Sequence, residues 1–108
     1  MKSVVIFLGL MGYAVICYGI GMPQDAEEIG CVNCHAIDHK VVGPAWIEVS
    51  KRYRDGRDKP EVFERLVKKV SKGGFGNWGD VPMVANDPIG TKHEKIVGLV
   101  KFILGLSQ

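Results

Sequence analysis

The sequence lacks several features that would place it in other classes of protein. Its 108 residues contain no internal repeat and no low-complexity tract, and no segment alternates between apolar and polar residues as a half-buried strand does. It has three cysteines, and two of them, Cys31 and Cys34, lie too close together for a disulfide that staples a fold. The sequence therefore excludes a repeat protein and a disulfide-rich scaffold, and it predicts an all-α domain.

An excess of charge of one sign is also missing. The chain has 14 Lys+Arg and 12 Asp+Glu, a net charge of +2. Without residues 1–21 the counts become 13 and 12, because only Lys2 is removed. A nearly neutral chain gives no electrostatic support for nucleic-acid binding. Apolar residues make up 46% and charged residues 24%, as in ordinary globular proteins, and the length has room for one domain.

Charge is absent from a long stretch near the N-terminus. Residues 4–20 are uncharged and mostly apolar, follow the basic Lys2, and end among small residues near Gly21. This pattern resembles a secretory signal peptide. We therefore predict a cleaved signal peptide over residues 1–21 and a mature domain over residues 22–108, located in the periplasm and not inserted in the membrane. An uncleaved membrane anchor is the alternative.

Helical patterns divide the mature chain. Residues 24–30 fit one or two helical turns, and residues 44–54 carry an apolar stripe at helical spacing. Pro60 begins a further helix with one apolar face. Thr91 and Glu94 form a capping-box pattern before a strongly apolar C-terminal segment. We expect three to four helices.

The segment CVNCH, residues 31–35, carries the strongest chemical signal. C-x-x-C-H is the sequence signature of c-type haem attachment. On a helical turn Cys31, Cys34 and His35 face the same way, so two thiols can bond to one haem while the imidazole reaches its iron. A thioredoxin-like pair would need a βαβ context, and a zinc site would need further ligands at a suitable spacing. We predict one covalently attached haem c, with His35 as an iron ligand.

Residues 73–90 form a long irregular segment, GGFGNWGDVPMVANDPIG, which is unusual in so small a domain unless it has a function. Met83 lies in this segment, directly after Pro82, and not in an apolar helical stripe where a core methionine is expected. A thioether opposite histidine is an arrangement used by electron-transfer haems, so we predict Met83 as the second axial ligand. Glycines should let the backbone approach the flat cofactor closely, at Gly73, Gly74, Gly76 and Gly79.

The motifs CVNCH, VGPAW, GNWGDVPM and VAN, taken in order, resemble the short bacterial class I monohaem cytochromes c, the cytochrome c five-fifty-one and five-fifty-two group. The resemblance covers nearly all of residues 24–107. It implies the class I cytochrome c fold, with helices wrapped around one haem c, and a periplasmic electron carrier that is not an enzyme. It also implies that His35 and Met83 hold the iron. If the position of Met83 were open instead, the protein would be a haem enzyme or a gas-binding haem protein.

The resemblance also implies roles for residues near the haem. The carbonyl of Pro44 accepts a hydrogen bond from the proximal imidazole, and Asn86 bonds near the methionine sulphur. Trp78 bonds a haem propionate, although packing alone would explain this residue equally well on its sequence context. Two differences from relatives stand out. MVAN occurs where relatives often have MPPN, and Lys69 occurs where some relatives have an arginine that contacts a propionate.

The partners implied by the resemblance are redox proteins. They are a membrane cytochrome complex upstream and a terminal oxidase, haem nitrite reductase or cytochrome peroxidase downstream, and we expect this chain to work as a monomer. Lysines cluster near the predicted haem segments, at Lys40, Lys68, Lys69 and Lys72. We predict that they guide an acidic partner by long-range attraction, the alternative being that they only complement the dipole of a solvated helix end.

Overall fold

The computed structural model describes residues 20–107 together with Gly9 and Gly12. The predicted signal peptide over residues 1–21 therefore lies almost entirely outside the described residues. Within residues 20–107 the structure contains helices and two isolated β-bridges but no sheet, which confirms the all-α prediction. None of the helices in this part of the chain combines the length and the apolar character that crossing a membrane would need.

Within residues 20–107, four α-helices follow one another, with ends within two or three residues of the predicted limits. They are α1 (Gln24–Ile29), α2 (Trp46–Arg52), α3 (Pro60–Lys72) and α4 (His93–Gly105). Two short 3-10 helices lie between them, η1 (Cys31–Asn33) and η2 (Arg54–Gly56).

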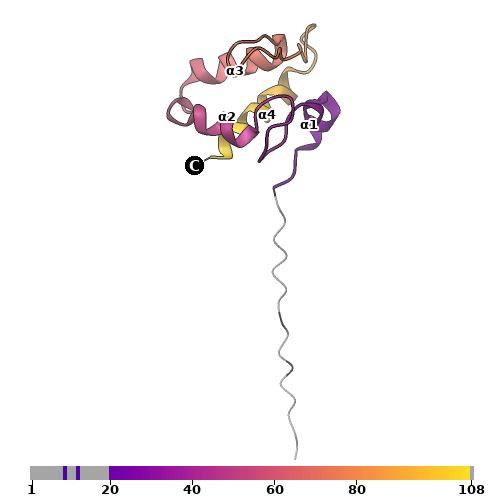
Figure 1. Cartoon of the computed structure of the whole chain (residues 1–108), viewed down its shortest axis with the longest axis vertical. Coiled ribbons are helices and arrows are strands. Elements are labelled where there is room, and N and C mark those ends of the chain that lie inside the picture. The colour runs from indigo at the N-terminus through magenta and orange to yellow at the C-terminus, as the bar shows by residue number, and fades with distance from the viewer. Residues whose placement is uncertain (1–8, 10–11, 13–19, 108) are drawn as a thin grey trace, which may run out of the picture.

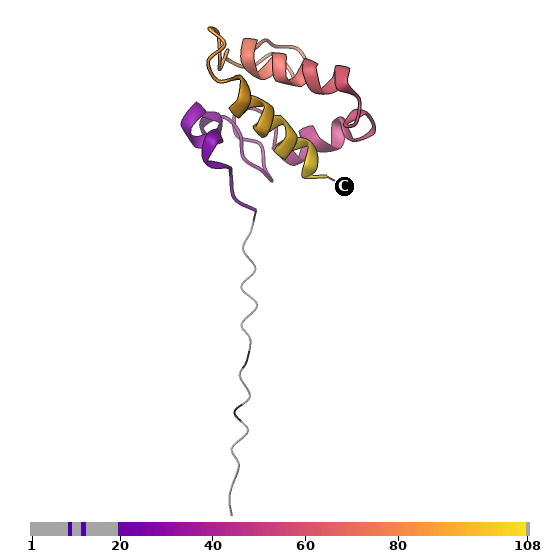
Figure 2. The same ribbon diagram turned by 180° about the vertical axis from the view of Figure 1, so that it is seen from behind.

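Helix α4 is the centre of the fold. It runs between α3 on one side and α1 and α2 on the other, and it contacts all three (Figures 1 and 2). Its sequence, HEKIVGLVKFILG, is apolar around most of its circumference, as expected for a helix that is covered on several sides. Its buried side chains are Ile96, Leu99, Val100, Ile103 and Leu104.

The core consists of two apolar clusters that share α4. One joins α4 to α1, η1 and α2 through Ala26, Cys31, Trp46, Leu99 and Ile103, and the other joins α4 to α3 through Val67, Ile96, Val100 and Leu104. On α3 only Val67 is fully buried, whereas Leu66 and Val70 on the same apolar face stay partly exposed. This face of α3 is therefore not covered by protein alone.

The start of α4 differs from the sequence-based prediction. Thr91 does not cap the helix, since the N-cap residue is Lys92 and no side chain of the predicted capping box bonds there. The buried carboxylate of Asp87 accepts the backbone N–H groups of Thr91 and Lys92, at 2.8 and 3.0 Å. The capping-box prediction is wrong, because Asp87 accepts the backbone N–H of Thr91 that Glu94 would bond in a capping box.

Candidate cofactor site

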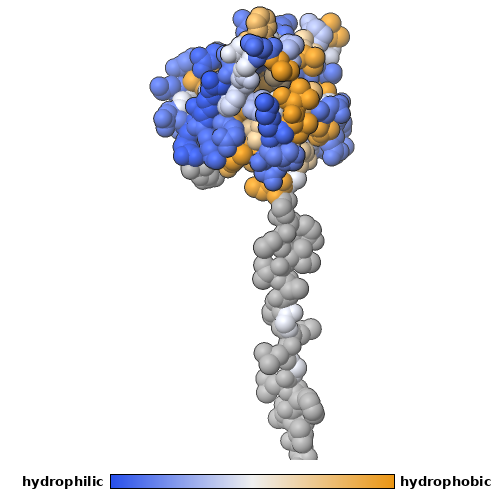
Figure 3. Space-filling view, viewed as in Figure 1, coloured by the Kyte–Doolittle hydropathy of each residue, from blue (hydrophilic) through white to orange (hydrophobic). Residues whose placement is uncertain are grey.

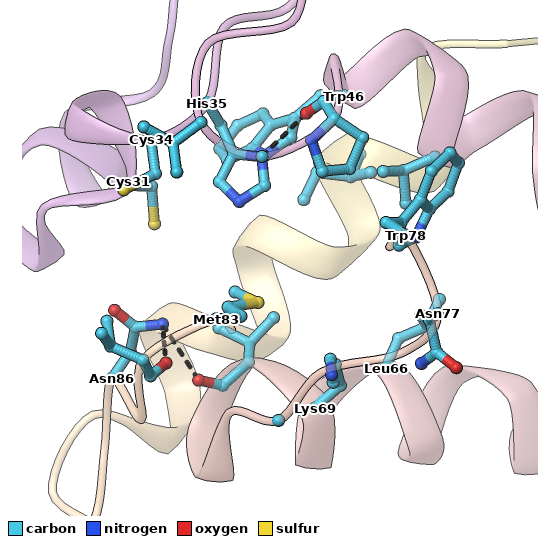
Figure 4. A pocket seen from close by; sticks show the side chains of 18 of the residues that line it. Cys31, Cys34, His35, Trp46, Leu66, Lys69, Asn77, Trp78, Met83 and Asn86 are labelled. Atoms are coloured by element: carbon cyan, nitrogen blue, oxygen red, sulfur yellow. Dashed lines mark hydrogen bonds between the residues drawn. The ribbon is translucent and has the colours of Figure 1, made fainter. Parts of the chain in front are cut away.

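One pocket collects most of the residues that the sequence singled out. Cys31, Cys34 and His35 line one wall, and Met83 lines the opposite wall. Figure 4 shows the imidazole and the thioether pointing toward each other across the space. The rest of the lining is mainly apolar and includes the partly exposed face of α3, at Leu66 and Val70, and the side of α4, at Leu99, Val100 and Ile103.

The cysteine wall is built by the tight turn η1. Gly30 precedes it with φ of 96°, and the N–H groups of Cys34 and His35 both bond to the carbonyl of Cys31, at 3.1 and 2.9 Å. This turn brings the three side chains to the same pocket, as the spacing predicted (Figure 4). Both cysteines are free thiols, and burial raises the pKa of the Cys31 thiol because its thiolate would lose solvation.

The imidazole of His35 has a fixed orientation. Its Nδ1 lies 2.8 Å from the backbone carbonyl oxygen of Pro44. A carbonyl only accepts hydrogen bonds, so Nδ1 carries the proton and donates, which leaves Nε2 with a free lone pair. Figure 4 shows this second nitrogen directed into the pocket. His35 is therefore prepared as a nitrogen ligand for a metal inside the pocket.

Gly43 provides the space in which this ring lies. The segment before Pro44 folds back over the cysteine turn, because the N–H groups of Val42 and Gly43 both bond to the carbonyl of Cys34. A Cβ at Gly43 would lie 2.4 Å from Cε1 of His35 and 2.9 Å from Nε2. Sequence reasoning missed this residue, and its only signal was a glycine directly before Pro44.

The backbone of Met83 is held by two glycines at the end of α3. Gly74 and Met83 exchange two hydrogen bonds, of 3.0 and 2.8 Å. Gly73 has φ of 72°, and a Cβ there would lie 2.4 Å from the carbonyl oxygen of Met83. We expected these glycines to approach the cofactor. Gly74 does line the pocket, but Gly73 instead makes room for the chain that carries the methionine.

Asn86 fastens the same segment to the end of α3. Its side-chain Nδ2 donates to the carbonyls of Val70 and Val84, at 3.1 and 3.2 Å, and its backbone N–H also bonds to Val70. The resemblance implied a bond near the sulphur of Met83, and the carbonyl of Val84 belongs to the next residue along the chain. Asn86 also lines the pocket, and its side-chain amide donates to two backbone carbonyls.

Two further expected residues lie at the pocket. Trp78 lines it and is 41% exposed, and the guanidinium of Arg52 lies over its ring at 4.2 Å from the centroid. Lys69 lines the pocket as well, so it is not simply a surface lysine (Figure 4). The sequence did not indicate the contact with Arg52, because the two residues are far apart in the chain.

Comparison with known proteins gives the family. Cytochrome c-551 from Allochromatium vinosum is 42% identical over 81 residues, which cover 75% of this chain and 81% of that protein. Cytochrome c2 from Rhodocyclus tenuis is 40% identical over 88 residues, covering 77% and 89%. The crystal structure of wild-type cytochrome c552 from Nitrosomonas europaea superposes with a TM-score of 0.65 at 32% identity, covering 76% of this chain and 95% of that one. No family model matches the sequence.

The chain belongs to the bacterial class I monohaem cytochromes c. The predicted class I fold is confirmed, and the cofactor of this cytochrome is one covalently attached haem c. The pocket suits such a group in three respects. It offers two free thiols beside each other, a histidine whose free nitrogen faces inward, and a largely apolar lining.

Gly43→Ala tests the space that this cytochrome keeps for His35. The backbone of Gly43 is not left-handed, so alanine meets no backbone strain there, but its methyl group would overlap the imidazole. We expect the haem-loaded variant to lose about 1–3 kcal/mol of unfolding free energy, as overpacked sites do. Urea titration gives this value, and the paramagnetic NMR shifts of the haem methyl groups should change because the ring is displaced.

Gly98→Ala is the matched control, since a Cβ at this position on α4 meets nothing within 4 Å. It should leave the NMR shifts unchanged and stabilise the helix slightly. If Gly43→Ala behaves like Gly98→Ala in both measurements, the ring does not depend on Gly43.

Proposed function

We propose that this electron-transfer cytochrome is a periplasmic one-electron carrier in which His35 and Met83 are the two axial ligands of the haem iron. The observation that supports this most directly is the placement of both side chains on opposite walls of one pocket, beside the paired cysteines (Figure 4). The haem, when bound, supplies reversible exchange of one electron between ferric and ferrous iron. The protein binds no substrate in this proposal and is not an enzyme.

The proposal assigns a role to six residues of the pocket. Cys31 and Cys34 attach the haem through thioether bonds, and His35 binds iron through Nε2. The bond from Nδ1 to Pro44 fixes the ring and increases its electron donation to the metal. Met83 supplies a soft sulphur ligand, which raises the reduction potential. Trp78 lies at the rim, where its indole N–H is suited to a haem propionate.

The position of Met83 also bears on the alternative function. A haem enzyme or gas-binding protein keeps one axial position open to its small ligand. Here the backbone N–H and the carbonyl of Met83 both form hydrogen bonds with Gly74. This pairing holds the thioether at the pocket. This arrangement favours the carrier over the protein with an open iron site.

Replacement of the methionine tests the ligand assignment. Met83→Ala should abolish the weak long-wavelength iron–sulphur charge-transfer band of the oxidised protein and lower its reduction potential, because the soft ligand is lost. Optical spectroscopy and potentiometric titration measure the two effects. Ile89→Ala, at an exposed residue of the same irregular segment that does not line the pocket, serves as the control. An unchanged spectrum and potential in Met83→Ala would show that another group, or none, occupies this position.

We further propose that this cytochrome works as a monomer with redox proteins as partners: a membrane cytochrome complex upstream, and an oxidase, nitrite reductase or peroxidase downstream. Apolar side chains reach the surface among polar ones (Figure 3). Val32, Val41 and Ile89, which do not line the pocket, are 38, 46 and 81% exposed. Of the clustered lysines, Lys40, Lys68 and Lys72 are exposed and can attract an acidic partner.

Charge reversal at two of these lysines tests the steering. In Lys68→Glu with Lys72→Glu, oxidation by hexacyanoferrate(III), an anionic probe, should become slower and its dependence on ionic strength should flatten or reverse. Stopped-flow kinetics measure the rate, and the optical spectrum should stay intact. Lys59→Glu with Lys101→Glu makes the same charge change at exposed residues outside this cluster, Lys59 being at the opposite end of α3. Equal rates in both double variants would mean that only net charge matters.

For the N-terminus we propose removal of residues 1–21 and export of the domain 22–108 to the periplasm. Met22 supports this boundary, because it is partly buried and packs against the cluster that contains Ala26 and Trp46. The packed domain therefore includes Met22. Mass spectrometry of the periplasmic fraction should give the mass of the chain from about Met22 plus one haem. Recovery of the intact chain from the membrane fraction would support the uncleaved anchor instead.

A further inference from the structure

Arg52 joins the two walls of the pocket at the surface. It is the last residue of α2, and its guanidinium lies over the ring of Trp78 at 4.2 Å from the centroid. Its Nη1 also donates to the backbone carbonyl of Asn77. One side chain of α2 thus makes a stacking contact and a hydrogen bond with neighbouring residues of the loop that carries Met83.

The loop has few other hydrogen bonds to the rest of the polypeptide near this point. Residues 75–82 are all exposed, and Gly76 and Gly79 have φ of 97° and 98°, a conformation that favours glycine. Among the hydrogen bonds of the described residues, those of 75–82 are one bond within the loop, from Gly76 to Gly79 at 3.0 Å, and the bond from Arg52. The Gly74–Met83 pair fastens the base of the loop but not its tip.

The contact connects the loop to the histidine wall. Helix α2 begins at Trp46, whose ring lies 6.2 Å from the ring of His35, centroid to centroid. It ends at Arg52, which reaches the loop of the opposite wall. Helix α2 therefore lines the pocket near the histidine side and contacts the loop through its C-terminal residue.

We propose that Arg52 is a positioning residue for Met83. By stacking on Trp78 and bonding to Asn77, it holds the tip of the loop against α2 and so keeps the methionine opposite His35. The inference rests on the proposed ligation by Met83. The planar guanidinium is suited to this double role, because it stacks on an aromatic face while its edge donates hydrogen bonds, which an ammonium group does poorly.

The chain offers close control residues. Lys51 precedes Arg52 on the same helix, is exposed, and forms an ion pair within its own helix with Glu48, at 3.1 Å. Lys51→Ala therefore removes the same charge from the same helix without touching the loop. Arg52→Lys keeps the charge but loses the planar group. Alanine is a good helix former, so neither alanine variant should prevent folding.

The test uses the haem-loaded protein and imidazole as an external ligand that competes with the methionine. Because Met83 must move away before imidazole binds, a looser loop should increase the apparent affinity. We expect Arg52→Ala to bind imidazole about three- to tenfold more tightly, which corresponds to about 0.7–1.4 kcal/mol, and Arg52→Lys to fall in between. Hydrogen–deuterium exchange of residues 74–84 should be faster in Arg52→Ala, whereas Lys51→Ala should match the wild type in both measurements.

Other outcomes would overturn the proposal. If Arg52→Ala and Lys51→Ala shift the imidazole affinity equally, the effect is one of charge and not of position. If Arg52→Ala lowers global stability in urea but changes neither imidazole affinity nor exchange of the loop, Arg52 is only structural. Met83→Ala tests the ligand assignment separately from the role of Arg52. If the imidazole affinity is unchanged in Met83→Ala, Met83 is not the ligand and Arg52 has no ligand to position.

Discussion

The hydrogen bond between Nδ1 of His35 and the carbonyl of Pro44 sets the geometry on which the rest of the pocket depends. It assigns the proton to one nitrogen, leaves the other free, and fixes the plane of the ring. The bond forms because the chain after the cysteine turn folds back on the carbonyl of Cys34, and Gly43 leaves room for the ring at the point of closest approach. The cysteines proposed to attach the haem and the residues that orient His35 thus belong to one continuous segment.

The opposite wall is constructed differently. Met83 lies on a long glycine-rich loop, and the loop is secured at its base by its pairing with Gly74 and by the bonds of Asn86 to the end of α3. At its tip, the loop contacts Arg52 through the carbonyl of Asn77 and the ring of Trp78. The histidine side is thus one continuous bonded segment, whereas the methionine side is held by a few separate contacts.

The same pocket explains an imbalance in the core. Helix α3 has a clear apolar face, yet only Val67 on it is fully buried, and Leu66 and Val70 face the pocket. A small domain buries a limited share of its surface, so an apolar cofactor placed against this face completes the core. Binding of the haem therefore adds to the stability of the folded state, as any ligand that binds only that state does.

The sequence by itself determined the local features of this cytochrome. Helical periodicity predicted three to four helices with limits close to the observed ones, and C-x-x-C-H spacing placed three side chains on one wall. Both inferences depend on residues within a few positions of one another. It also marked Met83 by its unusual context in a loop. These inferences needed no knowledge of how distant segments meet.

Tertiary structure alone decided the contacts between distant segments. Asn86 bonded to the end of α3, and Arg52 met Trp78 across the pocket. Neither propensity nor spacing encodes such pairs, because each depends on the packing of α2 and α3 against α4, which sets where the ends of the helices and the loop lie. The sequence specifies which groups are available, and the packing of the helices selects which of them come into contact.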